Sequence, residues 1–330
     1  MVKPVPMPRN GSPGEPAMPG DLSWERQPNR SAHEASAYET MAGIGRRLGG
    51  RMVLVAQQAA GEDGAVALGF DPTVPNPARM WNYWLGGKDN YAADRELAAR
   101  VQEIAPAAPA GARLVRRFLG DVVTRLAVEH GIRQFLDIGS GLPTADNTHE
   151  VARRAAPDAR VVYVDHDPVV VTHARALLGA VAEEEGTGVV RADLRDVDAV
   201  LAGAEPILDL ARPVAVLLVM VLHFIPDADD PWGIVRRLTA AVTPGSCLVI
   251  AHAASDVGIA GAAQSAAGRY NERSSGQVTL RTRDQVSRFF DGLEMLPPGL
   301  VPISAWWPER PPGARLTGSQ EAYCGIGRKP

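Results

Sequence analysis

Five short apolar runs alternate with helical patterns between residues 133 and 251. The apolar runs lie near residues 133–138, 160–165, 188–192, 213–220 and 245–251. The helical patterns between them lie near residues 147–156, 168–183, 195–202 and 229–242. Strands that alternate with helices in this way form a parallel sheet covered by helices on both faces. The sequence therefore predicts an α/β protein with a Rossmann-like, doubly wound, mostly parallel sheet.

Two of the predicted helices begin with capping signals. Asn147 precedes Glu150 by three residues, which is the spacing of a capping box. Asp167 precedes Pro168, which places an acid at the N-cap position and a proline at the first helical position. Asp167 is therefore interpreted as a helix cap rather than as a ligand-binding acid.

The C-terminal part has a different pattern. A helix is expected at about 282–290, a short strand at 293–296, a Pro-rich loop through Trp306 and a final strand at 322–327. Two strands joined without a helix favour an antiparallel hairpin at one edge of the sheet.

Three helices are predicted before the first strand. The apolar face of the first contains Met80 and Trp84 and ends at Gly86, and the next two helices lie near 90–103 and 107–129. Residues 76–131 thus form a helical cap on a domain that spans 76–330.

Ten of the first 28 residues are Pro or Gly, so residues 1–30 are predicted to be a disordered tail. Residues 31–75 are expected to be a poorly defined, partly helical extension.

Composition argues for a cytoplasmic protein that binds neither nucleic acid nor membrane. The net charge is −4, from 34 basic and 38 acidic side chains. The longest apolar stretch, 213–225, is too short to span a bilayer. Cys247 and Cys324 lack the spacing of a zinc site, so no metal is expected, and two cysteines are too few for a disulfide framework. Oligomeric state cannot be inferred from the sequence.

The first apolar run ends in a glycine loop, and the second ends on an acid. Residues 135–141 read Phe-Leu-Asp-Ile-Gly-Ser-Gly, so Asp137 is followed by Gly139, Ser140 and Gly141. Glycines let backbone N–H groups approach a ligand closely, and an acid that ends the next strand, here Asp165, can accept hydrogen bonds from both ribose hydroxyls. These two strand ends predict a site for a nucleotide-like cofactor.

The charge pattern favours S-adenosylmethionine over a dinucleotide. A dinucleotide site needs a third glycine where this chain has Thr144. Asp137 would repel a pyrophosphate, whereas it suits a ligand that carries an ammonium and a sulfonium group. An NAD-dependent dehydrogenase is thus disfavoured, and the cofactor that co-purifies with the protein would decide between the two.

The end of the third run completes the predicted cofactor site. Asp193 could accept a hydrogen bond from the adenine amine, with Leu194 against the ring, although Asp193 could equally be a plain loop acid. His166, beside Asp165, and Met220, at the end of the fourth run, are further cofactor-binding candidates. All of these residues would lie at the carboxyl edge of the sheet, where open α/β proteins bind ligands.

Four stretches resemble a bacterial family of class I S-adenosylmethionine-dependent methyltransferases whose methyl acceptors are largely unassigned. The resemblance covers residues from about 76 to 328 and is carried by residues 76–95, 135–150, 162–168 and 221–227. It implies a seven-stranded sheet of order 3-2-1-4-5-7-6 with an antiparallel seventh strand. Pro143 replaces the usual third motif glycine of this class.

The resemblance also implies that the stretch from Arg79 to Tyr91 covers the cofactor. The helical spacing of Trp81 and Trp84 is also typical of core packing, so Tyr91, beyond the glycine turn, is the better contact candidate. In this class the fourth strand ends opposite the transferring methyl. His223 follows that strand and could be a general base for the acceptor, or it could simply bond a backbone carbonyl.

These observations predict an enzyme that transfers a methyl group from S-adenosylmethionine to a small-molecule oxygen, nitrogen or sulfur acceptor. The Asn-Pro-Pro-Tyr type signature of nucleobase amino methylation is absent after the fourth run. The alternative is a non-catalytic regulatory protein that binds S-adenosylmethionine, because fold does not fix function.

Overall fold

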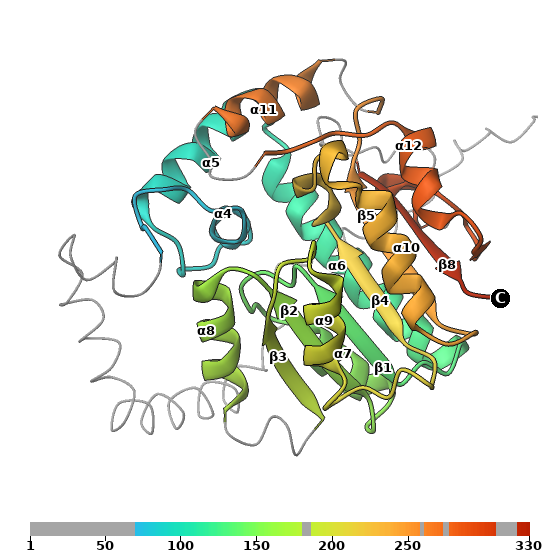
Figure 1. Ribbon diagram of the computed structural model, residues 1–330. Coiled ribbons are helices and arrows are strands. Elements are labelled where there is room, and N and C mark those ends of the chain that lie inside the picture. The colour runs from blue at the N-terminus through green and yellow to red at the C-terminus, as the bar shows by residue number, and fades with distance from the viewer. Residues whose placement is uncertain (1–69, 180–185, 258–260, 273–276, 308–321) are drawn as a thin grey trace, which may run out of the picture. The chain divides into compact units, whose positions relative to one another are not determined.

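The computed structural model describes residues 70–179, 186–257, 261–272, 277–307 and 322–330 (Figure 1). The predicted tail at 1–30 and nearly all of the predicted extension at 31–75 lie outside these ranges. The described residues contain a sheet covered by helices, and a helical cap at the carboxyl ends of its first strands.

The sheet has the order β3-β2-β1-β4-β5-β8-β6, which confirms the predicted fold. Neighbouring strands from β3 to β5 pair in parallel, and β8 is antiparallel to β5. Two short pieces, β6 and β7, both pair with β8, so the expected sixth strand is split and the sheet has eight strands rather than seven. The strands are β1 (Gln134–Ile138), β2 (Arg160–Asp165), β3 (Thr187–Arg191), β4 (Ala215–Val219), β5 (Cys247–Ala253), β6 (Glu294–Met295), β7 (Val301–Pro302) and β8 (Ala322–Arg328).

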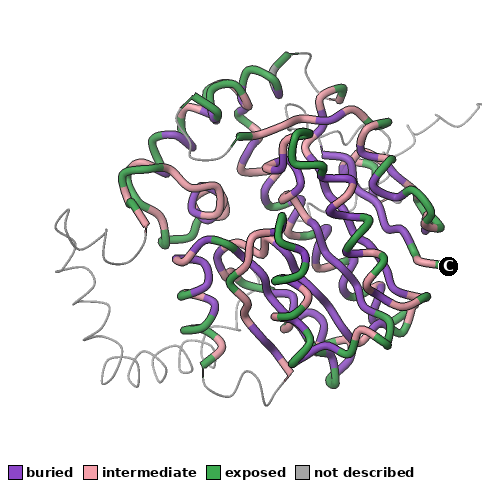
Figure 2. The backbone as a smooth tube through the Cα atoms, in the orientation of Figure 1, coloured by how far each residue is buried: buried purple, intermediate pink, exposed green. Residues whose placement is uncertain are grey.

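Each face of the sheet packs against its own helices. Alternate residues of β1 illustrate this, because Phe135 belongs to one buried cluster, whereas Leu136 and Ile138 belong to the other. The cluster of Phe135 includes residues of α6 (Ala108–Glu129) and α7 (Thr148–Ala155). The cluster of Leu136 includes residues of α9 (Val197–Ala204) and α10 (Pro231–Ala241), which lie in front of the sheet in Figure 1. In Figure 2 the strands between these layers are almost continuously buried.

The predicted helix starts after β1 and β2 are confirmed. Asn147 caps α7, and its backbone N–H donates to the Glu150 carboxylate at 2.7 Å. Asp167 caps α8 (Pro168–Leu178) by accepting from the backbone N–H of Val169 at 2.6 Å. The helix α8 is shorter than the predicted 168–183 because Gly179 adopts a left-handed φ of 69°.

The cap contains one helix that periodicity did not predict. The expected helices are α4 (Pro77–Trp84) and α5 (Ala92–Ile104). A further helix, α11 (Ala262–Asn271), comes much later in the sequence and packs on α5 (Figure 1). Its buried contacts are Ala263, Ala266 and Tyr270. Alanine buries little area, so this face gives a weak hydrophobic pattern.

The remaining short elements follow β5. α12 (Arg283–Ser287) continues into the 3₁₀ turn η3 (Arg288–Phe290), which together match the helix predicted at 282–290. Three further 3₁₀ turns are η1 (Leu222–Phe224) and η2 (Asp227–Asp229) after β4, and η4 (Ile303–Ala305) after β7. Within the described residues, no helix has the length and apolar character required to cross a membrane.

Candidate functional site

The loop after β1 needs glycine for two physical reasons. Gly139 and Gly141 have φ values of +72° and +67°, in the left-handed region that favours glycine. A Cβ on Gly139 would lie 2.4 Å from a methyl group of Val221, so the loop after β1 packs directly on the residues that follow β4. At Gly139 the group that leaves no room for a side chain is therefore part of the protein itself. A Cβ on Gly141 would lie 4.0 Å from the Ala78 Cβ, so Gly141 has more space around it.

Asp165 ends β2, and its carboxylate connects the glycine loop after β1 to the residues after β2. Its Oδ2 accepts from the backbone N–H of Gly141 at 3.0 Å, and its Oδ1 accepts from the backbone N–H of Asp167 at 3.0 Å. Burial raises the pKa of Asp165, while these two hydrogen bonds oppose the shift. Each carboxylate oxygen still has acceptor capacity for one further donor.

Asp137 is a buried carboxylate with a single protein hydrogen bond among the described residues. Its Oδ2 accepts from the Thr148 hydroxyl at 2.6 Å. Burial raises the pKa of Asp137 to about 6, and the positive charge of Arg116 opposes the shift. A cation placed beside Asp137 would relieve the desolvation of its ionised form.

Both acids lie on one cleft, with an empty volume of about 910 Å³ that includes space open to solvent. Seven of the predicted site residues line it, namely Asp137, Gly139, Ser140, Gly141, Asp165, His166 and Met220. The opposite wall comes from α4, α6 and the residues after β4, including Asn76, Ala78, Trp81, Asn82, Leu85, Leu119, Val221 and Phe224. Arg116 also starts from α6, but its guanidinium reaches the loop after β1 on the side of the two acids. Tyr91, Asp193, Leu194 and His223 are not among the lining residues.

Tyr91 stabilises the cap at a distance from this lining. It is the N-cap residue of α5, and its ring lies 5.8 Å from the Phe70 ring and 5.1 Å from the Arg79 guanidinium carbon. Its side chain is 39% exposed. The structure thus gives Tyr91 a packing role within the cap, and its assignment to the cofactor is not supported by this geometry.

Asp193 and Leu194 follow β3 with separate roles. The Asp193 carboxylate pairs with Arg195 at 3.0 Å, and this arginine also bonds Asp229 at 2.7 Å. Leu194 is 5% exposed and belongs to the core cluster around β1 and β4. The adenine assignment of these two residues stays a prediction.

His223 lies beneath Phe224 rather than on the cleft. Its side chain is 4% exposed, and the two rings are 4.1 Å apart, so Phe224 is the member of the pair that lines the cleft. Its Nδ1 has no hydrogen-bond partner among the described residues. Burial holds the pKa of His223 well below its usual value, with neighbouring His252 and Arg281 adding to the shift. A buried imidazole behind an aromatic ring favours a packing role for His223, but the bond to a backbone carbonyl that the sequence analysis considered is not formed at Nδ1.

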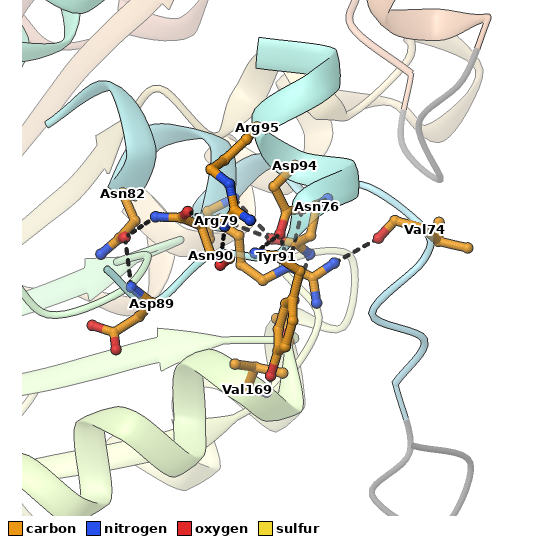
Figure 3. Close-up of polar contacts among 12 residues, drawn as sticks. Val74, Asn76, Arg79, Asn82, Asp89, Asn90, Tyr91, Asp94, Arg95 and Val169 are labelled. Carbon is orange, nitrogen blue, oxygen red and sulfur yellow. Dashed lines mark hydrogen bonds and ion pairs between the residues drawn. The ribbon is translucent and has the colours of Figure 1, made fainter. Parts of the chain in front are cut away.

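The cap is held together by a buried ion pair (Figure 3). Arg79 and Asp94 are 2% and 0% exposed and approach to 3.0 Å. Asp94 also accepts from the backbone N–H groups of Asn76 and Tyr91, both at 2.8 Å. The Asn76 side chain in turn donates to Asp167, which ties the start of α4 to the cap of α8.

Asn82 holds the turn between α4 and α5 and was missed in the sequence. Its Oδ1 accepts from the backbone N–H of Asp89 at 3.0 Å and from the Asn90 amide at 2.8 Å (Figure 3). A Cβ on Gly87 would lie 2.3 Å from the Asn82 amide nitrogen, so glycine is required where the turn passes Asn82. No short motif marks such a residue, because its role depends on the fold of the turn.

The cap aromatics divide between the two roles considered from the sequence. Trp81 lines the cleft and also packs on the cluster that contains α6. Tyr83 and Trp84 pack instead on the buried cluster that includes Leu97 and Val101 of α5. Tyr83 and Trp84 therefore have the core-packing role, whereas Trp81 forms part of the cleft wall.

Arg116 is a second lining residue that the sequence did not reveal. It extends from α6, and its guanidinium donates to the backbone carbonyls of Ala145 and Asp146 at 3.2 and 3.0 Å. It places a positive charge near Asp137 at one end of the cleft. In a chain rich in arginine, no local pattern distinguishes this one.

The lining is chemically compatible with S-adenosylmethionine. Asp137 provides a buried anion whose ionised form is poorly solvated, as an ammonium or sulfonium group requires. Asp165 retains acceptor capacity for hydroxyl groups, and Arg116 offers a cation for a carboxylate. Within the described residues, no group of three or more His, Cys, Asp or Glu side chains could hold a metal ion.

Comparison with known proteins gives consistent results. The sequence profile of the S-adenosyl methyltransferase family matches residues 65–330. A DUF574 family protein from Streptomyces avermitilis is 38% identical with a TM-score of 0.74, and the match covers 79% of this chain and 99% of that one. A candidate methyltransferase from Thermobifida fusca is 40% identical with a TM-score of 0.72, over 78% of this chain and 96% of that one. A search of curated proteins finds no match.

Proposed function

The chain belongs to the S-adenosyl methyltransferase family and uses S-adenosylmethionine as its methyl donor, and we propose that it methylates a small-molecule oxygen, nitrogen or sulfur acceptor in the cleft between the sheet and α4. The observation that carries this proposal is the placement of Asp137 and Asp165 on one wall of that cleft, opposite an apolar wall. A site with both kinds of wall can bind a charged cofactor and a second, less polar molecule together.

Residues on the sheet side would hold the cofactor. Asp165 would accept from the ribose hydroxyls, and Asp137 would balance the positive charge of the methionine part. Arg116 would pair with the carboxylate, and Asp193 would accept from the adenine amine. When bound, the cofactor supplies a methyl group on a positively charged sulfur, which is an electrophile that needs no further activation by the protein.

Methyl transfer in this site would depend on positioning rather than on a base. The cleft would hold the acceptor heteroatom in line with the methyl group that the bound cofactor would supply, and the proton released by the acceptor would pass to water. His223 is buried behind Phe224 and is poorly placed to take that proton. Holding the two reactants in line can supply much of the rate acceleration.

The negative net charge of the protein and the few basic residues of its cleft favour a small cytoplasmic acceptor over a nucleic acid. The net charge is −4, and Arg116 and His166 are the cationic or ionisable basic residues among those that line the cleft. A nucleic-acid acceptor would need several phosphate contacts from Lys or Arg.

Labelled S-adenosylmethionine tests the proposal. The protein is incubated with the methyl-labelled cofactor and a fractionated cell lysate, and we expect label to appear in a small metabolite. Label in DNA or RNA alone would contradict the small-molecule acceptor. Tight cofactor binding without transfer to any fraction would favour the non-catalytic regulatory alternative.

A further inference from the structure

Charged and apolar residues occupy different parts of the cleft. The charged or titratable lining residues are Arg116, Asp137, Asp165, His166 and Asp167. Asp137 lies in β1, Asp165 ends β2, and His166 and Asp167 follow β2. Arg116 reaches the loop after β1 through its bonds to Ala145 and Asp146. The charged parts of the cofactor therefore have partners only beside β1 and β2, among the described residues that line the cleft.

Part of the remaining lining forms an apolar wall, which we define as Trp81, Leu85, Leu119 and Phe224, and the uncharged polar residues of the lining are Asn76, Asn82, Ser140 and Thr144. Leu119 is buried, and the other three are half-buried. The wall is supported from behind, because Trp81 packs on the cluster that contains α6, and the Phe224 ring lies 6.1 Å from the Tyr270 ring. A firmly packed wall without charge favours an uncharged occupant, since a desolvated ion would have no partner there.

Asn82 adds one polar group to this part of the cleft. It is 3% exposed and lines the cleft one helical turn beyond Ala78, which faces Gly141. Its Oδ1 is committed to Asp89 and Asn90, and this pairing defines which amide atom is oxygen. Its Nδ2 donates to no described residue. The Asn82 residue is almost fully buried, but its Nδ2 is not among the buried side-chain atoms that lack a partner, so this donor is accessible and free to bond a ligand atom in the cleft.

We propose that the methyl acceptor is an uncharged, largely apolar molecule that rests on the apolar wall and carries an oxygen or nitrogen atom that accepts a hydrogen bond from Asn82. This inference rests on the proposed function, because it assigns the second molecule of the same cleft. Asn82 acts as a specificity-determining residue, since it selects a molecule with an acceptor atom at one position.

Matched neutral and charged aromatic probes test the proposal. The protein, saturated with S-adenosylhomocysteine, is titrated with acetophenone and 2-acetylnaphthalene, and separately with benzoate and 2-naphthoate, which have similar shapes but a negative charge. We expect at least one ketone to bind saturably and about tenfold or more tighter than its carboxylate partner, because the carboxylate loses hydration without gaining a counter-charge.

Asn82→Asp tests the donor. Aspartate keeps an oxygen for Asp89 and Asn90 but replaces the Nδ2 donor with an acceptor, so ketone affinity should fall about tenfold. The control is Asn90→Ala, which removes a hydrogen bond of the same turn and leaves the Nδ2 donor in place. Melting temperature and S-adenosylhomocysteine affinity, measured for each variant, show that the fold and the cofactor site remain intact.

Different outcomes would contradict the neutral acceptor, the role of Asn82 and the proposed function. Tighter binding of the carboxylates, or no saturable binding of either ketone while S-adenosylhomocysteine binds, would overturn the neutral acceptor and leave the cofactor site standing. Equal ketone affinity in Asn82→Asp and in the unaltered protein would overturn the role of Asn82. Failure of S-adenosylhomocysteine to bind would contradict the proposed function itself.

Discussion

The two walls of the cleft are built in different ways. The sheet wall consists of strand ends, where Asp137 is the second-last residue of β1 and Asp165 is the last residue of β2. The cap wall consists of side chains from α4, α6 and η1 that are brought together by tertiary contacts, with the buried pair of Arg79 and Asp94 behind them. One wall carries charged side chains, and the other is mostly apolar.

This difference separates the chemistry of the cofactor from the selection of the acceptor. Strand ends at the carboxyl edge of a parallel sheet are fixed by the fold, so they suit a ligand that never changes. A wall of side chains on separate helices can change without disturbing the sheet, so it suits the part of the site that determines specificity.

The largest expected effect concerns the stability of the cap wall. Asp94→Ala leaves the Arg79 guanidinium buried without its partner, and we expect unfolding free energy to fall by about 3–5 kcal/mol in chemical denaturation. The control is Arg237→Ala, which removes an exposed pair with Asp198 and should cost about 0–1 kcal/mol. A loss for Asp94→Ala no larger than the control would show that the pair does not hold the cap.

The next effect concerns the affinity of the sheet wall for the cofactor. Asp165→Ala removes a carboxylate that would bind ribose hydroxyls, with each charge-assisted hydrogen bond worth about 1.5–3 kcal/mol. Calorimetric titration with S-adenosylhomocysteine should show affinity about tenfold weaker or more. Unchanged affinity in a variant that melts cooperatively would remove Asp165 from the cofactor site.

The pH dependence of cofactor affinity should identify Asp137 as a titrating group of the site. Burial raises the pKa of Asp137 from 3.8 to about 6, so protonation is favoured in the folded protein, and stability falls as pH rises from about 4 to about 6. A cationic ligand favours the ionised form, so cofactor affinity should fall about tenfold for each pH unit below 6. Asp137→Asn should bind more weakly above pH 6 and lose this slope. A slope that persists in Asp137→Asn would assign the titration to another group.

The smallest effect on transfer is expected for His223. His223→Ala creates a cavity behind Phe224 and should lower unfolding free energy by about 1–3 kcal/mol, with the rate per folded molecule nearly unchanged. If His223 were the general base, the rate would instead fall about 10²–10⁴-fold with stability and cofactor affinity intact. Transfer rates and melting curves of the same variant distinguish these results.

Local pattern predicted the sheet wall and missed much of the cap wall. The strand ends at Asp137 and Asp165 and the cap at Asp167 follow from residues adjacent in sequence, so their spacing was enough. Asn82 and Arg116 line the cleft because helices far apart in the chain meet there, and no local signal records that meeting. The helix α11 was missed because its buried face is mostly alanine.

The predicted roles of His223 and Tyr91 also show what the order of residues in the sequence does not predict. Position after β4 was right for His223, but the ring that reaches the cleft belongs to its neighbour Phe224. Tyr91 lies beyond the glycine turn, as expected, yet its ring packs within the cap against Phe70 and Arg79. Residue order identifies which segment is near a site, whereas side-chain direction depends on packing.

A crystal structure of the complex with S-adenosylhomocysteine tests the central claim most directly. We predict that the ligand lies between the two walls, with its ribose hydroxyls on the Asp165 carboxylate, its ammonium group beside Asp137, and the apolar wall left open for a second molecule. A ligand bound outside this cleft, or one that fills the apolar wall and leaves Asp165 without a contact, would contradict the assignment of the two walls.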